Sequence, residues 1–153
     1  MSFSEQYFEI LIRDDSKEIL GDIIWETDSN HPRSLVFKTD IYSRVNYPIY
    51  LKGNFHFKRK TLSFSMIHQD VGRIYGLDMG QTHKNPSTGK KTGRVHKHRW
   101  TDLYRDKEAY VPPDITKPYN DVIGVWREFC LESKITHSGK MLGLPDGQQL
   151  NLF

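Results

Sequence analysis

The chain has 153 residues, of which 37% are hydrophobic, 12% aromatic and 27% charged, and its formal net charge is +3. This length is typical of one domain, and the composition is too apolar and too aromatic for an intrinsically disordered protein. The longest apolar runs are about four residues, far below the roughly 20 that span a membrane, and the N-terminus lacks the features of a signal peptide. One cysteine, Cys130, excludes an intramolecular disulfide. We therefore expect a small cytoplasmic domain without membrane contact.

The first half of the chain predicts strands. Residues 7–13 and 18–27 are rich in β-branched and aromatic side chains, and Asp14-Asp15-Ser16 between them is typical of a turn. Polar and apolar residues alternate along several of the segments that follow, which is the period of half-buried strands. These further strands are predicted over residues 33–42, 48–58, 62–67 and 73–79. The junctions between them are short and favour an antiparallel meander.

A long loop and one helix are predicted in the second half. Residues 80–94 are almost all loop formers, and a loop of this length often has a function. A short strand over 95–100 returns from the loop. Apolar residues then recur at helical spacing from Val122 to Cys130, which predicts a helix that begins near Asn120. Because Cys130 lies on the apolar face of this helix, we interpret it as a core residue rather than a nucleophile.

Together these elements predict an α+β fold. We expect a mainly antiparallel, partly curled β-sheet that is covered by one C-terminal helix. Residues 1–138 form a single domain in this prediction. Residues 139–153 contain Gly143, Pro145 and Gly147 and are predicted to form a flexible, extended tail.

Positive charge is concentrated in the middle of the chain. Residues 41–101 contain twelve Lys and Arg but only two acidic residues, whereas the rest contains ten Lys and Arg and seventeen acidic residues. This asymmetry indicates an anionic partner such as DNA or RNA, although a solvated sheet face also explains it. We assign anion binding to six basic residues of the loop and the following strand: Lys84, Lys90, Lys91, Arg94, Lys97 and Arg99.

Three histidines lie near the predicted loop, and they allow three interpretations. His96 and His98 share one face of a strand about 6–7 Å apart, close enough to bind one metal ion or one phosphate. With His83, and with Asp78 or Asp102 nearby, they could form a zinc or other transition-metal site. Without a metal, the histidines could cleave RNA as general base and general acid. The third interpretation is an anion-binding face without chemistry. No cofactor other than such a metal is expected.

Residues 50–135 also resemble an uncharacterised family of small bacterial proteins. In that family a strand that ends in Leu-Asp precedes His-x-Asn-Pro, His-x-His and Asp-Lys-x-Ala motifs and a helix with a Phe-x-x-Cys-like end. The matching segments here are Leu77-Asp78, His83 to Pro86, His96 to His98, Asp106 to Ala109, and Phe129-Cys130. The resemblance supports the importance of the histidine region and implies no mechanism.

The C-terminal segment Gln149-Leu150-Asn151-Leu152-Phe153 resembles the peptide by which bacterial polymerases and repair proteins bind the sliding clamp. The resemblance covers five residues. In such a peptide, Leu152 and Phe153 can enter an apolar pocket, Leu150 a neighbouring cleft, and Gln149 can form hydrogen bonds at the edge. A match to this pattern at any position of the chain has a chance probability on the order of 10⁻³.

The leading prediction is therefore a protein that binds the sliding clamp and inhibits or modulates replication, as a toxin-like protein or as an inhibitor from a phage or mobile element. We expect binding rather than catalysis to be its main activity. One alternative is a toxin-like ribonuclease or metal-dependent nuclease that uses His83, His96 and His98. Another is a non-catalytic nucleic-acid-binding module. The expected partners are the clamp, DNA or RNA, and a cognate antitoxin.

Overall fold

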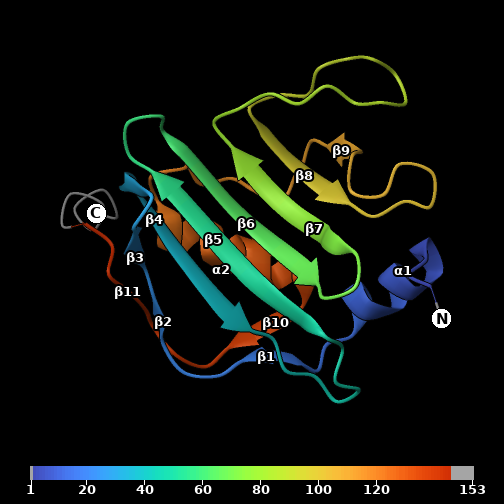
Figure 1. The fold of residues 1–153 in the computed structure, drawn as a ribbon, viewed down its shortest axis with the longest axis horizontal. Coiled ribbons are helices and arrows are strands. Elements are labelled where there is room, and N and C mark those ends of the chain that lie inside the picture. Colours follow the sequence, from blue (N-terminus) through green and yellow to red (C-terminus); the bar gives the residue numbers. More distant parts are fainter. Residues whose placement is uncertain (1, 146–153) are drawn as a thin grey trace.

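The computed structural model describes residues 2–145, and a seven-stranded antiparallel sheet dominates it (Figure 1). The strands follow one another in the sheet in chain order, which confirms the predicted meander, and the sheet is not closed. Short turns connect β4 to β7, whereas the predicted loop, residues 80–94, connects β7 to β8. The strands are β3 (Glu26–Asp28), β4 (His31–Asp40), β5 (Ile49–His56), β6 (Thr61–His68), β7 (Gly72–Met79), β8 (Val95–Arg99) and β9 (Ala109–Tyr110).

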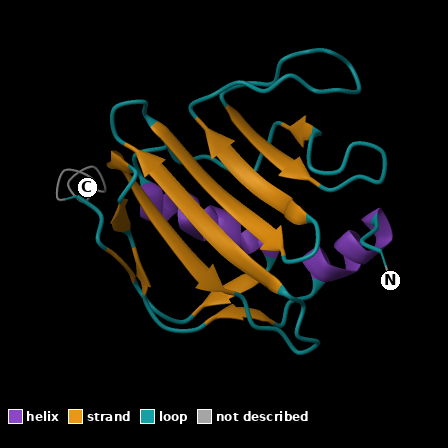
Figure 2. Cartoon of the chain, in the orientation of Figure 1, coloured by secondary structure: helices purple, strands orange, loops and turns teal. Residues whose placement is uncertain are grey.

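One face of the sheet is apolar and the other is polar, because side chains alternate along each strand. In β6, Leu62, Phe64 and Met66 are buried, while Ser63 and Ser65 between them are partly exposed. The apolar face packs on α2 (Val122–Ser133), which lies behind the sheet in Figure 2. Among the described residues, no helix covers the polar face, which we call the open face.

Helix α2 has the limits that its sequence predicts. The Asp121 side chain caps its first turn by accepting a hydrogen bond from the Gly124 N–H at 3.0 Å. Lys134 ends the helix in the left-handed conformation. Trp126 and Phe129 are buried against Phe64 of β6, with ring centroids 5.1 and 5.4 Å from the centroid of the Phe64 ring. These contacts fix the helix to the centre of the sheet.

The predicted strand over 7–13 is wrong, because these residues belong to helix α1 (Glu5–Arg13). The Ser4 hydroxyl accepts a hydrogen bond from the Tyr7 N–H at 3.1 Å and caps the helix. Phe8, Leu11 and Ile12 are buried at helical spacing, whereas Ile10 is 60% exposed. A half-buried strand would bury Phe8, Ile10 and Ile12 instead. The β-branched composition was therefore misleading.

The predicted strand over 18–27 is broken into β1 (Lys17–Ile19), β2 (Ile23–Ile24) and β3. Gly21 lies between the first two with φ of +80°, a conformation that interrupts a strand. Strands β1 and β2 pair in parallel with β10 (Ile135–His137) and β11 (Met141–Leu142).

The first part of the predicted tail packs on the domain. Met141 and Leu142 form β11, and Leu144 is buried in the core. Folded structure therefore continues past the predicted limit at residue 138. The clamp-like peptide, residues 149–153, lies outside the described residues. Neither described helix is long and apolar enough to cross a membrane.

Candidate metal centre

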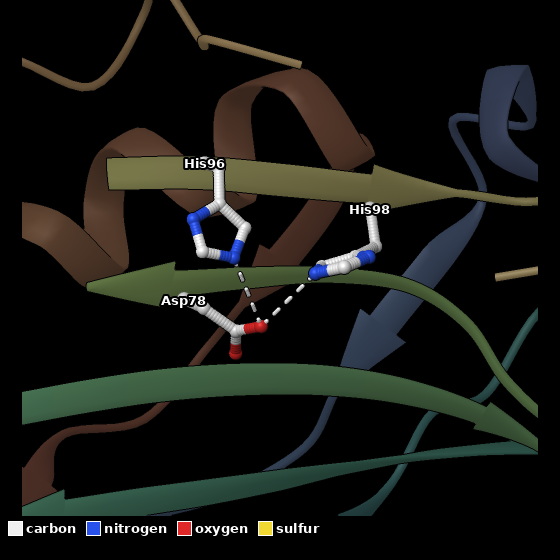
Figure 3. A group of neighbouring side chains, drawn as sticks. All are labelled: Asp78, His96 and His98. Carbon is white, nitrogen blue, oxygen red and sulfur yellow. Dashed lines mark ion pairs between the residues drawn. The ribbon is translucent and has the colours of Figure 1, made fainter. Parts of the chain in front are cut away.

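Strands β7 and β8 bring Asp78, His96 and His98 together on the open face (Figure 3). The register places Asp78 opposite His96, and Gly76 opposite His98. His96 and His98 share a face because they are two residues apart in a strand, as the sequence predicts. Both histidines are only 2% exposed, while Asp78 is 27% exposed. The cluster is thus largely buried, with its carboxylate accessible from the open face.

The distances in this cluster fit a single metal ion. Asp78 Oδ2 lies 3.5 Å from His96 Nε2 and 3.2 Å from His98 Nε2. One potential ligand atom from each residue lies within 4.8 Å of the others. Tetrahedral bonds of 2.0–2.2 Å would separate two ligand atoms by about 3.3–3.6 Å. The observed separations are close to that range, so the three side chains can bind one ion.

Backbone carbonyls fix the protonation of both histidine rings. His96 Nδ1 lies 3.0 Å from the Gly93 carbonyl oxygen, and His98 Nδ1 lies 2.8 Å from that of Asp106. Because a carbonyl oxygen only accepts hydrogen bonds, each Nδ1 must carry the proton. In a neutral ring Nε2 then presents a lone pair to the carboxylate of Asp78. A cation or an additional proton between these atoms is needed to relieve the repulsion, and this ring orientation is common among metal-binding histidines.

Arg73 adds positive charge next to Asp78. Its Nη1 lies 3.3 Å from Asp78 Oδ2, and its Nε donates to Asp106 Oδ2 at 3.1 Å. Burial alone raises the pKa of Asp78, but the hydrogen bonds from His96 and His98 and the charge of Arg73 outweigh it. The pKa of Asp78 therefore lies well below its usual range, and its carboxyl group is ionised.

Sequence reasoning missed Arg73, because simple alternation places it on the buried face with Tyr75 and Leu77. The pairing of β6 with β7 shifts between Met66 and Ile67, and this irregularity brings Arg73 to the open face. Its side chain passes over Gly76, where an added Cβ would lie 3.2 Å from Arg73 Cδ and 3.0 Å from a backbone oxygen. Glycine at this position thus leaves room for Arg73 to reach Asp78.

The third predicted histidine, His83, lies beside the cluster. Its ring centroid is 4.5 Å from that of His98 and 5.7 Å from that of His96. Its Nε2 donates to the Lys107 carbonyl at 2.6 Å. The structure therefore brings all three histidines together, but Asp78 takes the place of His83 in the compact ligand set. Asp102, the other predicted carboxylate, instead accepts a hydrogen bond from the Glu5 N–H at 2.7 Å.

Residues of the loop and of the segment before β9 support the cluster. The Asn85 side chain donates to the Ala109 carbonyl and accepts from the Ala109 N–H, both at 2.8 Å. Asp106 supplies the carbonyl that orients His98 and the carboxylate that binds Arg73. The histidine, Asn-Pro and Asp-Lys motifs singled out in the sequence therefore meet around one site.

Lys97 does not belong to the predicted anion-binding surface. It lies between the two histidines in β8, so its side chain projects to the opposite face of the sheet and is fully buried. Its Nζ donates to Asp114 at 2.6 Å and to Glu132 of α2 at 3.0 Å, which neutralises its charge internally. The alternation of residues in His96-Lys97-His98 already indicates these opposite directions.

The Lys97 network connects β8 to α2 directly behind the metal-binding cluster. Glu132 also accepts hydrogen bonds from the hydroxyls of Tyr75 at 2.5 Å and Tyr110 at 2.8 Å. Burial raises the pKa of Glu132, but the hydrogen bonds from Tyr75, Tyr110 and Lys97 lower it further, so the carboxyl remains ionised. The network thereby fixes the strand that holds His96 and His98.

The other predicted anion-binding residues differ in their surroundings. Arg99 pairs with Glu9 of α1, so part of its charge is neutralised internally. Arg94 donates to the Gly80 carbonyl at 3.0 Å and remains exposed. Three lysines of the 80–94 loop are exposed and lie close to the cluster in sequence: Lys84, Lys90 and Lys91.

Cys130 packs against the core, as predicted. It is partly buried on α2, and burial raises the pKa of its thiol to about 12. A thiol with this pKa is almost fully protonated at neutral pH and is a poor nucleophile.

Residues 3–135 match the model of DUF6978, a family of unknown function. The chain belongs to the DUF6978 family. The match includes every side chain of the candidate metal centre, and it ends before β11 and the clamp-like peptide. No curated protein and no solved structure matches the chain.

Proposed function

We propose that this DUF6978 domain binds a divalent transition-metal ion through Asp78, His96 and His98 and hydrolyses phosphodiester bonds in nucleic acid. One observation carries the metal assignment. Both histidines donate from Nδ1 to backbone carbonyls, so both Nε2 atoms face the same carboxylate oxygen at metal-site distances. A divalent cation removes the repulsion between these groups and satisfies all three at once.

The number of ligands suits catalysis better than a structural role. Structural zinc sites usually have four protein ligands, whereas catalytic sites have three and leave a position for water or substrate. An ion in such a site lowers the pKa of bound water to about 7 and stabilises charge on a phosphoryl oxygen. His83 lies next to His98 and is placed to exchange a proton near the reacting groups.

The surrounding charge favours an anionic substrate. The loop begins immediately after β7, which contains Asp78, and ends one residue before His96 in β8. It carries the exposed side chains of Lys84, Lys90, Lys91 and Arg94. Exposed cations beside a metal centre attract the phosphate backbone of a nucleic acid and orient it there.

Metal content and cleavage can be measured on the same preparations. We expect the full chain to bind one zinc or manganese ion and to cleave a fluorescent RNA or DNA strand, and we expect EDTA to abolish cleavage. His96→Ala, His98→Ala and Asp78→Asn should lose both properties. Asp102→Asn is a matched control, because Asp102 lies outside the cluster. Strand binding without metal binding or cleavage would instead favour the non-catalytic module.

The C-terminal peptide supports a second proposal, binding to the bacterial sliding clamp through Gln149, Leu150, Leu152 and Phe153. The Gln-Leu-x-Leu-Phe pattern in the sequence supports it. This binding would bring the domain to DNA or block other clamp partners, in a toxin-like or phage-derived inhibitor of replication. Replacement of Leu152 and Phe153 by Ala should remove the affinity, because each anchor contributes about 2 kcal/mol or more. Calorimetric titration of the full chain with clamp tests this, and no binding by the unmodified chain would refute it.

A further inference from the structure

A cavity of about 380 Å³ lies next to the metal-binding cluster on the open face of the sheet. Asp78 belongs both to its wall and to the cluster. The other lining side chains come from the start of β4, the end of β5, the β5–β6 turn and the residues around β6 and β7. They include His31, Asn54, His56, Arg59, Ser63 and Gln81.

The cavity lining is rich in hydrogen-bond donors. Asp78 is the only acidic residue among its lining residues, while Asn54, Ser63 and Gln81 are neutral groups that both donate and accept. The register places Asn54, Ser63 and Asp78 side by side across β5, β6 and β7. A row of neutral polar groups therefore leads from the cavity to the metal-binding carboxylate.

Two basic side chains give the cavity a preference for anions. The His56 Nδ1 accepts a hydrogen bond from the Arg59 backbone N–H at 3.0 Å, which places the ring proton of a neutral His56 on Nε2. His56 thus offers a donor at its outer nitrogen. Arg59 is exposed and forms no ion pair with any residue of the described chain, 2–145. Its guanidinium group is free to bind a phosphate through two parallel hydrogen bonds.

We infer that this cavity binds one nucleotide of a nucleic-acid strand, next to the phosphodiester bond at the metal centre. Arg59 and His56 bind a phosphate, while the amides of Asn54 and Gln81 form hydrogen bonds with the base or sugar. The volume is near the lower end of the range for ligand pockets, which suits one nucleotide rather than a base pair. The inference rests on the proposed function, because it assigns the substrate class of the same site.

The test measures strand binding without catalysis. Fluorescence anisotropy of a labelled 12-nucleotide single strand is recorded with the full chain in EDTA, at several salt concentrations. We expect Arg59→Gln to weaken binding about 10- to 100-fold, the usual effect of losing hydrogen bonds to a charged group. Loss of one phosphate contact should also reduce the slope of log affinity against log salt by about 0.7. His56→Ala should weaken binding in the same direction.

Arg127→Gln is the matched control, because it removes the same charge from the exposed side of α2, on the other face of the sheet. It should change affinity less than twofold. Equal affinities of Arg59→Gln and Arg127→Gln, or no strand binding by the unmodified chain, would overturn the inference. A chain that binds no metal but loses strand affinity in Arg59→Gln would overturn the proposed function and leave the nucleotide site in place.

Discussion

Removal of the buried charge of Lys97 should destabilise the whole domain. Lys97 is fully buried, and its Nζ donates to both Asp114 and Glu132. In Lys97→Met, a side chain of similar shape replaces the ammonium group, and both carboxylates lose their cation. Breaking a fully buried ion pair in this way typically costs about 3–5 kcal/mol.

The surroundings of the two carboxylates reduce this figure. Asp114 is 29% exposed and Glu132 is 35% exposed, so water partly screens both charges. Glu132 also retains the hydrogen bonds from Tyr75 and Tyr110. We therefore expect a loss of about 2–3 kcal/mol in the free energy of unfolding. For a chain of this size, that loss lowers the melting temperature by roughly 4–12 °C.

Thermal and urea unfolding followed by circular dichroism measure this loss. Lys91→Met is the control, because Lys91 is exposed in the loop, and it should change stability by less than about 0.5 kcal/mol. Lys97→Met combined with Glu132→Gln should recover part of the loss, since it removes one of the unpaired charges. A Lys97→Met variant that melts within 1–2 °C of the unmodified chain, roughly the shift from 0.5 kcal/mol, would refute the assigned role of this network.

Three further predictions concern other parts of the fold. Gly53→Ala should cost about 1–3 kcal/mol in urea unfolding, because the new Cβ would lie 2.0 Å from a ring carbon of buried Phe37; Gly89→Ala, where the nearest atom is 3.9 Å away but φ is +68°, should cost less. Cys130 should react with iodoacetamide at pH 8 at least about 100-fold more slowly in the folded chain than in urea, since burial raises its pKa to about 12, and equal rates would show an accessible thiolate. Burial lowers the pKa of Lys17 to about 8, so the unfolded chain holds more protons above that pH, and the contribution of Lys17 to stability should rise from pH 8 to about 10. This rise should be absent from Lys17→Met; parallel pH profiles for the two chains would contradict it.

The sequence predicts the parts of the fold that follow from local periodicity. Alternation along residues 48–58 and 62–67 predicts β5 and β6, and apolar spacing predicts α2 with its Asn-Asp start. The N-terminal helix was misread because its apolar run satisfies two periods, and only the exposure of Ile10 distinguishes them. Composition favoured the strand, whereas packing against the core favours the helix.

The candidate site shows the same division. The His96-Lys97-His98 spacing predicts two histidines on one face, and the structure also brings the predicted His83 and Asp78 to them. Arg73 could not be predicted, because a register shift between β6 and β7 moves it across the sheet. The cavity with His56 and Arg59 depends on which strand ends meet at one edge, and this is a property of the assembled sheet.

Metal titration of the full chain tests the central claim most directly. Calorimetry with zinc and with manganese, together with elemental analysis, should give one ion per chain for the unmodified protein and for Asp102→Asn. We expect affinity to fall at least tenfold in His96→Ala and in His98→Ala, because each removes one of three protein ligands. An unmodified chain that binds neither ion, or His96→Ala and His98→Ala variants that bind as tightly as Asp102→Asn, would show that Asp78, His96 and His98 form an internal ion-pair cluster and not a metal centre.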